Sequence, residues 1–188
     1  MTVIGDSVTL AAAPALSEAL PGLTVDAAVS RDVEDGIAAL RERLDAGTLG
    51  GIVVVSLSTN SEMTREKIDR VVEIARTGEP RRVVLVTGQA PPELTWVEAS
   101  NAAVREASGP GGPAVLADWA AASAGRPELL VSDGVHPQPE GQRLYARTIA
   151  DAVDRARAEP APGGPGPVRE TRRASRRRLH RRRALPAA

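Results

Sequence analysis

Two residues suited to nucleophilic chemistry stand at opposite ends of the sequence. Ser7 lies in VIGDSVTL, where a short apolar strand should end and a helix should begin. A serine nucleophile needs a base, and histidine is the usual one because its pKa lies near neutral. Apart from His180, which lies in an arginine-rich tail, the chain has one histidine, His136. Composition therefore pairs Ser7 with His136.

The loop around His136 has the residues needed to orient an imidazole. In SDGVHPQPEG, Asp133 precedes His136 by three positions, and Gly134 allows the chain to fold back. The carboxylate could then hold Nδ1–H while Nε2 faces Ser7. Each motif also has a plain structural interpretation, with Asp6 and Ser7 as a helix cap and Asp133 with His136 as a local turn.

Two further segments could stabilise an oxyanion. The buried strand in VVVSLSTNSEMT ends near Asn60, whose amide could donate to developing negative charge or could form a local turn or a cap of the next helix. The segment VDAAVSRD ends in Ser30 and Arg31, where the Ser30 N–H is a weaker candidate donor and a surface turn is the simpler interpretation.

The pattern that must position these residues is one of short β-branched runs alternating with amphipathic segments. It predicts an α/β fold, a three-layer α/β/α sandwich with a five-stranded parallel sheet, in which the strand ending at Asn60 adjoins the first strand. Ligands bind such sheets beyond the carboxyl ends of the strands. The predicted strands are 2–5, 23–29, 51–57, 82–87 and 114–118, and the predicted helices are 9–20, 33–46, 64–76, 95–107 and 138–157.

Charge divides the chain into two parts. Residues 160–188 contain nine arginines and one glutamate, a net charge of +8, and the rest of the chain has a net charge of −8. We predict one domain over 1–158, followed by a Pro/Gly linker and a disordered basic tail over 159–188. The tail could contact an anionic polymer or lipid, whereas nucleic acid is disfavoured because no aromatic residues interleave the arginines.

Several classes of function are excluded by what the sequence lacks. There is no cysteine, so thiolate catalysis and disulfides are excluded, and one histidine among scattered carboxylates predicts no metal site and no cofactor. No apolar stretch is long enough to span a bilayer, and the first residues do not resemble a signal peptide. We assign Trp119 to the core, although its ring could also stack on a sugar, and we do not place Trp96 in the site.

The combination of GDSV, a strand ending in Asn60, and DGVH resembles the SGNH (GDSL-type) hydrolases over residues 2–157. VDAAVSRD, LADWAAASAG and SDGVHPQPEGQRLYA are most similar to the extracytoplasmic SGNH domain of acyltransferase-3-type peptidoglycan O-acetyltransferases. The resemblance implies a flavodoxin-like sheet and these roles: Ser7 as nucleophile, His136 as base, Asp133 as orienting acid, and Ser7, Ser30 and Asn60 as the oxyanion hole. Where Ser30 and Ser58 stand, the family usually has glycine.

The resemblance also implies the reaction, a serine esterase or O-acyltransferase that acts on acyl esters, acetyl above all, of cell-wall carbohydrate through an acyl-Ser7 intermediate. It implies an extracytoplasmic location, and it leaves two alternatives: a stand-alone relative, or a severed C-terminal domain whose partner is a membrane acyltransferase domain missing from this chain. A non-catalytic flavodoxin-like binding module with a basic tail is the alternative that the sequence leaves open.

Overall fold

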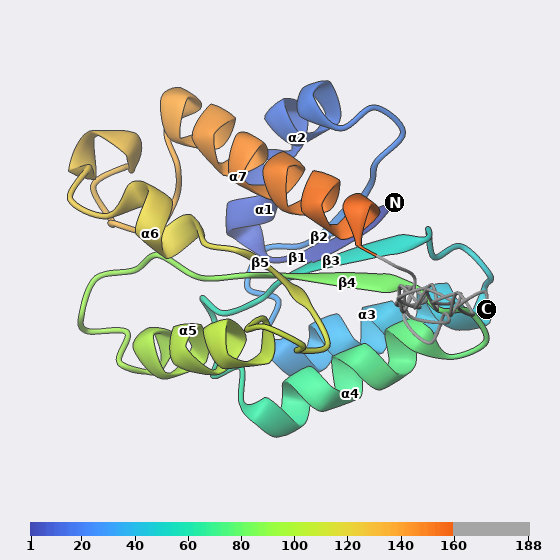
Figure 1. Ribbon diagram of the computed structural model, residues 1–188. Coiled ribbons are helices and arrows are strands. Elements are labelled where there is room, and N and C mark those ends of the chain that lie inside the picture. The colour runs from blue at the N-terminus through green and yellow to red at the C-terminus, as the bar shows by residue number, and fades with distance from the viewer. Residues whose placement is uncertain (160–188) are drawn as a thin grey trace, which may run out of the picture.

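Five parallel strands form the centre of the molecule (Figure 1). The structure is a computed structural model that describes residues 1–159, so the predicted basic tail lies outside the described residues. The strand order is β2-β1-β3-β4-β5, so β3 adjoins β1 as predicted. The strands are β1 (Thr2–Gly5), β2 (Thr24–Ala27), β3 (Ile52–Ser56), β4 (Arg82–Val86) and β5 (Val115–Ala117).

Helices cover both faces of this sheet, which confirms the predicted three-layer α/β/α sandwich (Figure 1). On one face lie α1 (Ser7–Ala11), α2 (Ala13–Ala19), α6 (Trp119–Ser123) and α7 (Pro139–Ala158). On the other lie α3 (Val33–Asp45), α4 (Arg65–Arg76) and α5 (Trp96–Ala107).

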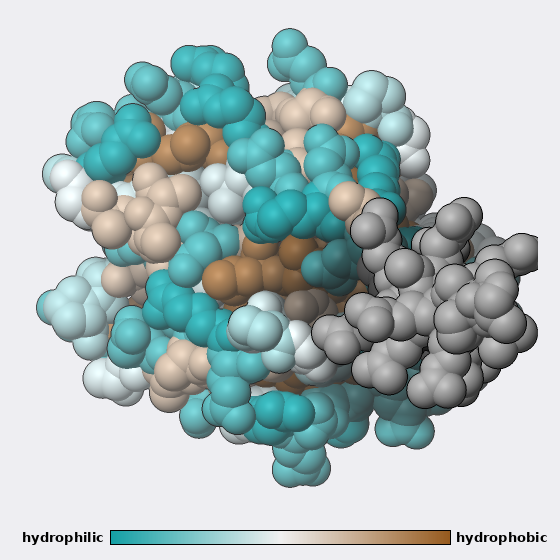
Figure 2. Space-filling view, in the orientation of Figure 1, coloured by the Kyte–Doolittle hydropathy of each residue, from teal (hydrophilic) through white to brown (hydrophobic). Residues whose placement is uncertain are grey.

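Strand residues alternate between two apolar cores because successive side chains point to opposite faces of a sheet. Val54 and Val84 pack in the core beneath α7, whereas Val53 and Leu85 pack against α3 and α4. Figure 2 shows hydrophilic side chains over the outer faces of the helices and apolar ones in the seam between the two helical layers. A core of Val, Leu, Ile and Ala therefore supports the sheet from both sides.

The structure differs from the prediction in the first helix, which is two helices rather than one over 9–20. Helix α1 begins at Ser7, and the chain leaves helical geometry at Ala12 before α2. Pro14 has no N–H to donate to the carbonyl of Leu10, so a continuous helix would lack that bond. The break shortens the element that carries Ser7.

Two short elements between β5 and α7 were not predicted. Helix α6 begins after Asp118, whose carboxylate accepts from the Ala121 N–H, and the 3₁₀ helix η1 (Pro127–Leu129) follows. Both are too short to show a period in the sequence. They carry the chain across the sheet to the loop that contains His136.

Candidate active site

Ser7 lies at the first position of α1, directly beyond the carboxyl end of β1. Asp6 caps this helix, with its Oδ1 accepting from the Val8 N–H at 2.9 Å. Gly5 is needed for close packing, since a Cβ there would lie 2.3 Å from the Thr9 hydroxyl oxygen. Asp6 is therefore the helix cap, and the Ser7 hydroxyl is available for other contacts.

The imidazole of His136 joins Ser7 to Asp133. Its Nε2 lies 2.8 Å from the Ser7 hydroxyl, and its Nδ1 lies 2.7 Å from Oδ2 of Asp133. Because an ionised carboxylate can only accept, Nδ1 is the donor to Asp133, and in the neutral ring Nε2 accepts from the Ser7 hydroxyl. The arrangement matches the nucleophile, base and orienting acid of a serine hydrolase triad.

The loop that carries His136 is closed by its own hydrogen bonds. The Val131 N–H donates to the carbonyl of His136 at 2.8 Å, and Gly134 has a φ of 70°, a left-handed conformation that glycine adopts at little cost. The second carboxylate oxygen of Asp133 accepts from the N–H groups of Val135 and His136. Gly134 folds the chain back as the sequence predicted.

The electrostatics of this loop favour an ionised Asp133. Burial opposes the charge, but bonds from the backbone and imidazole of His136 and from the Val135 N–H hold the pKa of Asp133 below its usual range. The side chains of His136 and Asp133 are 38% and 46% exposed. The hydrogen bonds within the loop therefore act on Asp133 and His136, while the imidazole stays accessible to solvent.

A different balance governs Asp6, beneath Ser7. Burial raises the pKa of Asp6 and outweighs the hydrogen bond that its Oδ1 accepts from the Val8 N–H. Its Oδ2 has no hydrogen-bond partner among the described residues. A charge at Asp6 is thus disfavoured, in contrast to Asp133.

Ser30 occupies the turn after β2. Among the described residues, it is the one residue other than glycine that has a positive φ. Its φ is 56°, in the left-handed region. That conformation costs a residue with a Cβ about 1–2 kcal/mol. The turn therefore keeps a glycine-like backbone despite the serine side chain.

Asn60 lies after β3, and its side chain reaches across to the turn that follows β2. Its Nδ2 donates to the carbonyl of Arg31 at 3.1 Å. The cap of α4 is Thr64, so Asn60 is not the helix cap that its sequence position also allowed. One amide hydrogen of Asn60 is thus engaged with the β2 turn and the other is left for a further acceptor.

A buried polar chain supports the start of α1 from below. Tyr145 of α7 donates its hydroxyl to Ser56 Oγ at 2.8 Å and lies 2.8 Å from the Thr9 hydroxyl. Burial raises the pKa of Tyr145, so the phenol stays neutral. No role for Tyr145 was predicted from the sequence, although it is the one tyrosine of a chain that has no phenylalanine.

The two tryptophans have structural roles. Trp119 is 1% exposed and packs edge-on against Tyr145, with ring centroids 5.4 Å apart, which confirms its assignment to the core. Trp96 donates its Nε1 hydrogen to the carbonyl of Thr59 at 3.1 Å. Trp96 thereby fixes the segment that leads to Asn60.

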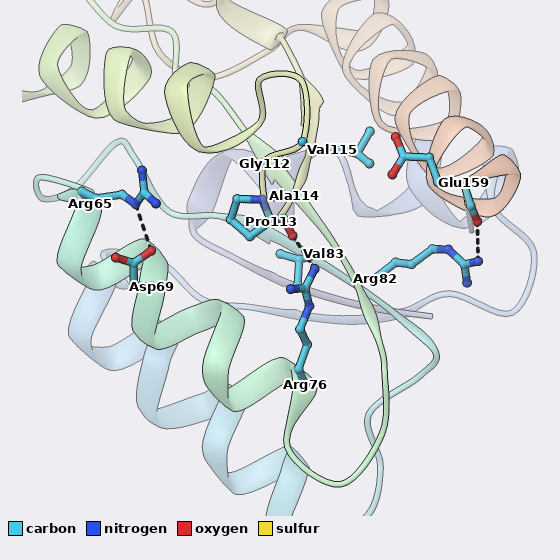
Figure 3. A pocket seen from close by; sticks show the side chains of 11 residues that line it. Arg65, Asp69, Arg76, Arg82, Val83, Gly112, Pro113, Ala114, Val115 and Glu159 are labelled. Atoms are coloured by element: carbon cyan, nitrogen blue, oxygen red, sulfur yellow. Dashed lines mark hydrogen bonds and ion pairs between the residues drawn. The ribbon is translucent and has the colours of Figure 1, made fainter. Parts of the chain in front are cut away.

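A cleft of about 550 Å³ lies far from these groups, at the amino ends of β4 and β5 (Figure 3). Arg65 pairs with Asp69, Arg76 donates to the carbonyl of Pro113, and Arg82 donates to the carbonyl of Glu159. Ser7, Asp133 and His136 are not among its lining residues. The cleft is therefore separate from the candidate active site.

Two features are absent from residues 1–159. No group of three or more His, Asp and Glu side chains in this part of the chain could hold a metal ion. None of its helices combines the length and apolar character that crossing a membrane requires.

Comparison with known proteins gives a consistent class. No family model matches the chain. The C-terminal catalytic domain of Streptococcus pneumoniae peptidoglycan O-acetyltransferase A, solved with a methylsulfonyl adduct, has a TM-score of 0.76 and 29% identity, covering 85% of this chain and 94% of that one. A carbohydrate esterase of family 3 from Talaromyces cellulolyticus shares the fold, with a TM-score of 0.66 and 16% identity over 85% of this chain and 98% of that one.

These likenesses show a chain with the fold of the SGNH/GDSL hydrolases and an enzyme of hydrolase or acetyltransferase type. More particularly, it is a homologue of the peptidoglycan O-acetyltransferases. The Listeria monocytogenes peptidoglycan O-acetyltransferase OatA is 26% identical over 152 residues, which are 81% of this chain and 24% of that protein. The chain thus spans about a quarter of the length of the curated relative.

Proposed function

We propose that this protein is a serine O-acyltransferase or esterase that carries an acyl group, acetyl above all, on Ser7. The observation that supports this most is the continuous hydrogen-bonded path from the Ser7 hydroxyl through His136 to Asp133, at 2.8 and 2.7 Å. Such a path activates a serine that would otherwise be a weak nucleophile.

In the first half of the reaction, Ser7 Oγ bonds to the carbonyl carbon of an acyl ester while His136 Nε2 takes the hydroxyl proton. The Ser7 and Ser30 N–H groups and the Asn60 amide hold the oxyanion. The intermediate collapses as the bond to the leaving oxygen breaks and His136 returns the proton to it. Asp133 stabilises the imidazolium throughout without accepting the proton.

In the second half, an acceptor hydroxyl attacks the acyl-Ser7 carbonyl and His136 removes its proton. Water as acceptor gives a carboxylic acid and a free serine, and a sugar hydroxyl gives a new ester. The accessibility of His136 and Asp133 supports a large acceptor. The relatives' names support cell-wall carbohydrate as that acceptor. The family resemblance of the sequence adds an extracytoplasmic location and a membrane acyltransferase domain as acyl donor to this proposal.

Three exposed apolar side chains that are near the proposed site residues in the sequence support an acyl substrate. The large apolar side chains that are most exposed in the described part are Leu10, one turn after Ser7, Val29, next to Ser30, and Val131, two positions before Asp133. The exposure of Val29 is 70%. A binding module without catalysis would have no use for the Ser7 to His136 path, so the catalytic function is favoured.

The test is ester cleavage by the purified chain. We expect release of p-nitrophenol from p-nitrophenyl acetate, its abolition in Ser7→Ala, and wild-type rates in Ser17→Ala, which changes an exposed serine of α2. Intact-protein mass spectrometry should detect one acetyl group on the wild type and none on Ser7→Ala. Unchanged activity in Ser7→Ala would overturn the proposal.

A second measurement separates transfer from hydrolysis. Soluble peptidoglycan glycan fragments added with the ester should become acetylated, as read by chromatography and mass spectrometry, and should raise the rate of p-nitrophenol release. If the fragments are never acetylated although Ser7-dependent cleavage occurs, the protein is an esterase with water as its acceptor.

A further inference from the structure

The side chain of Arg31 points into the protein, although the sequence favoured a surface turn for Ser30 and Arg31. The side chain is 14% exposed, and its guanidinium donates to the carbonyl of Asp26 at 2.7 Å, to the carbonyl of Gly5 at 3.3 Å, and to Asp26 Oδ1 at 2.8 Å. The planar fork of arginine suits such a set of acceptors, which one ammonium could not span. Arg31 therefore ties the turn after β2 to the end of β1.

The backbone of Arg31 contacts the remaining parts of the candidate oxyanion hole. It directly follows Ser30, and its carbonyl accepts from Asn60 Nδ2 at 3.1 Å. Its side chain binds Gly5, two positions before Ser7. One residue thus joins the three segments that carry the three candidate donors of the oxyanion hole.

Ser30 needs an external restraint to keep its conformation. A residue with a Cβ persists in the left-handed region when its surroundings over-determine it, and Ser30 has a φ of 56°. The adjacent turn bond, from the Arg31 N–H to the carbonyl of Ala28, is long at 3.5 Å. The guanidinium bonds of Arg31 are shorter and more numerous, so they are the stronger restraint on this turn.

We propose that Arg31 is a positioning residue that sets the Ser30 N–H and the Asn60 amide against the oxyanion formed at Ser7. This rests on the proposed acyl transfer through Ser7. Arg31 does not touch the substrate, and its effect passes through the two donors. Because the turn has serine at the left-handed position, the backbone alone would otherwise have to hold this conformation, and the contacts of Arg31 supply the restraint instead.

The chain offers a matched control in Arg43. Its Nε pairs with Oδ2 of Asp26, the carboxylate that also binds Arg31, but the described contacts of Arg43 include none with Gly5, Ser30 or Asn60. Removal of Arg43 therefore weakens the same ion-pair cluster without releasing the turn. The comparison separates loss of a salt bridge from loss of positioning.

The experiment measures kcat and KM for p-nitrophenyl acetate in Arg31→Ala, Arg31→Lys and Arg43→Ala. We expect Arg31→Ala to lower kcat about 10- to 100-fold with KM within about threefold, which is less than the 10²- to 10³-fold typical of deleting one donor outright. Arg31→Lys should fall between Arg31→Ala and the wild type, and Arg43→Ala should stay within about twofold of it. Arg31 and Arg43 carry the same charge and differ only in their contacts.

A double-mutant cycle with Asn60→Ala gives a readout that a merely structural role would not move. If Arg31 acts through Asn60, Arg31→Ala should reduce kcat less in the Asn60→Ala background than in the wild type. In two-dimensional NMR, the Ser30 backbone amide and the Asn60 side-chain amide should shift in Arg31→Ala and stay in place in Arg43→Ala.

The outcomes distinguish this proposal from the proposed function. Wild-type protein without Ser7-dependent acyl chemistry removes both. Wild-type activity that is retained in Arg31→Ala, or losses that multiply in the cycle, overturns the positioning role alone. Should Arg31→Ala fail to fold by circular dichroism, Arg31→Lys decides the matter, because full activity in a folded lysine variant would contradict the role assigned to the guanidinium fork.

Discussion

Polar and charged side chains are arranged differently at the two ends of the parallel strands. The side of the sheet where the strands begin is called the amino edge, and the side where they end is called the carboxyl edge. At the amino edge, Arg65, Arg76 and Arg82 line a cleft of about 550 Å³ (Figure 3). At the carboxyl edge, Ser7 and His136 are held in contact by short hydrogen bonds and stay partly accessible. The cleft and the candidate active site are therefore separate features of the molecule. Reactivity follows from a preorganised path for a proton and for negative charge.

Carboxyl groups near the carboxyl ends of the strands differ among themselves, since burial raises the pKa of Asp6 whereas three other aspartates have lowered values. Asp26, Asp118 and Asp133, whose pKa values are all lowered, belong to the carboxyl half of the sheet or to the loops beyond it. In each case burial opposes the charge and hydrogen bonds from arginine, imidazole or backbone outweigh it. At this edge the charges are held by specific partners, which is the condition for orienting a catalytic group.

Among the variants that test this difference between the two edges, Asp133→Asn is expected to have the largest effect on kcat. The variant keeps an oxygen to accept from the Val135 N–H, but its amide can donate to Nδ1 of His136 and so stabilise the wrong tautomer. We expect kcat for ester cleavage to fall about 10²- to 10⁴-fold with an unchanged melting curve. Asp69→Asn, at the amino-edge cleft, is the control and should match the wild type. More than a tenth of wild-type activity in Asp133→Asn would remove Asp133 from the mechanism.

Acid should weaken the carboxyl edge through Asp26. Burial opposes ionisation of Asp26, but Arg43 and Arg31 lower its pKa, so the unfolded chain binds the proton more readily than the folded protein. The stabilisation is therefore present above the ordinary aspartate pKa, about 4, and is lost as the pH falls below it. Thermal melts should show a falling Tm below about pH 4, and in Asp26→Asn a lower Tm at pH 7 with a shallower acid dependence. Parallel curves for the two proteins would contradict this assignment.

A smaller effect is expected from Ser30→Gly. Glycine adopts a φ of 56° without strain and keeps the backbone N–H. Relief of strain is partly offset by the greater freedom of glycine in the unfolded chain, so the free energy of unfolding should rise by no more than about 1 kcal/mol. Ester cleavage should stay within about threefold of the wild type because the donor is retained. A large loss of kcat would show that the Ser30 side chain itself takes part.

The smallest effect on activity is expected from Arg76→Ala at the amino edge. The variant loses the bond to the carbonyl of Pro113 and lowers the free energy of unfolding by about 1–2 kcal/mol. Its kcat should stay within about twofold of the wild type, since changes remote from the reacting atoms act mainly on stability. Arg31→Ala, measured beside it, is the arginine variant expected to differ. Equal losses in both would abolish the distinction between the edges.

Much of the fold was predictable from local patterns. The β-branched runs that became β3 and β4, and the Thr64 cap of α4, are short-range signals that tertiary structure did not override. The break at Ala12 and the elements α6 and η1 were missed, because elements of three to seven residues have too few turns to show a hydrophobic period. Pro14 was the one visible sign of the break.

Some residues of the candidate site could be predicted from the sequence, and others could not. Ser7 and His136 could be paired because the chain offers so few alternatives, and Asp133 because it lies in the same loop. The contact between Arg31 and Gly5 joins β1 to a turn 26 residues later, and the Tyr145 support joins α7 to α1. Neither pairing has a local signal, since each depends on which strands and helices become neighbours.

The sequence by itself determined which groups are present: a serine after the first strand, one histidine in a glycine-bearing loop, and a core without phenylalanine. Only the tertiary structure decided that the imidazole stands 2.8 Å from that serine, and that Arg31 faces inward instead of toward solvent. The reason is that side-chain chemistry and turn preference act within a few residues. Distances between segments far apart in the chain are set by the order of the parallel strands and the packing of helices upon them.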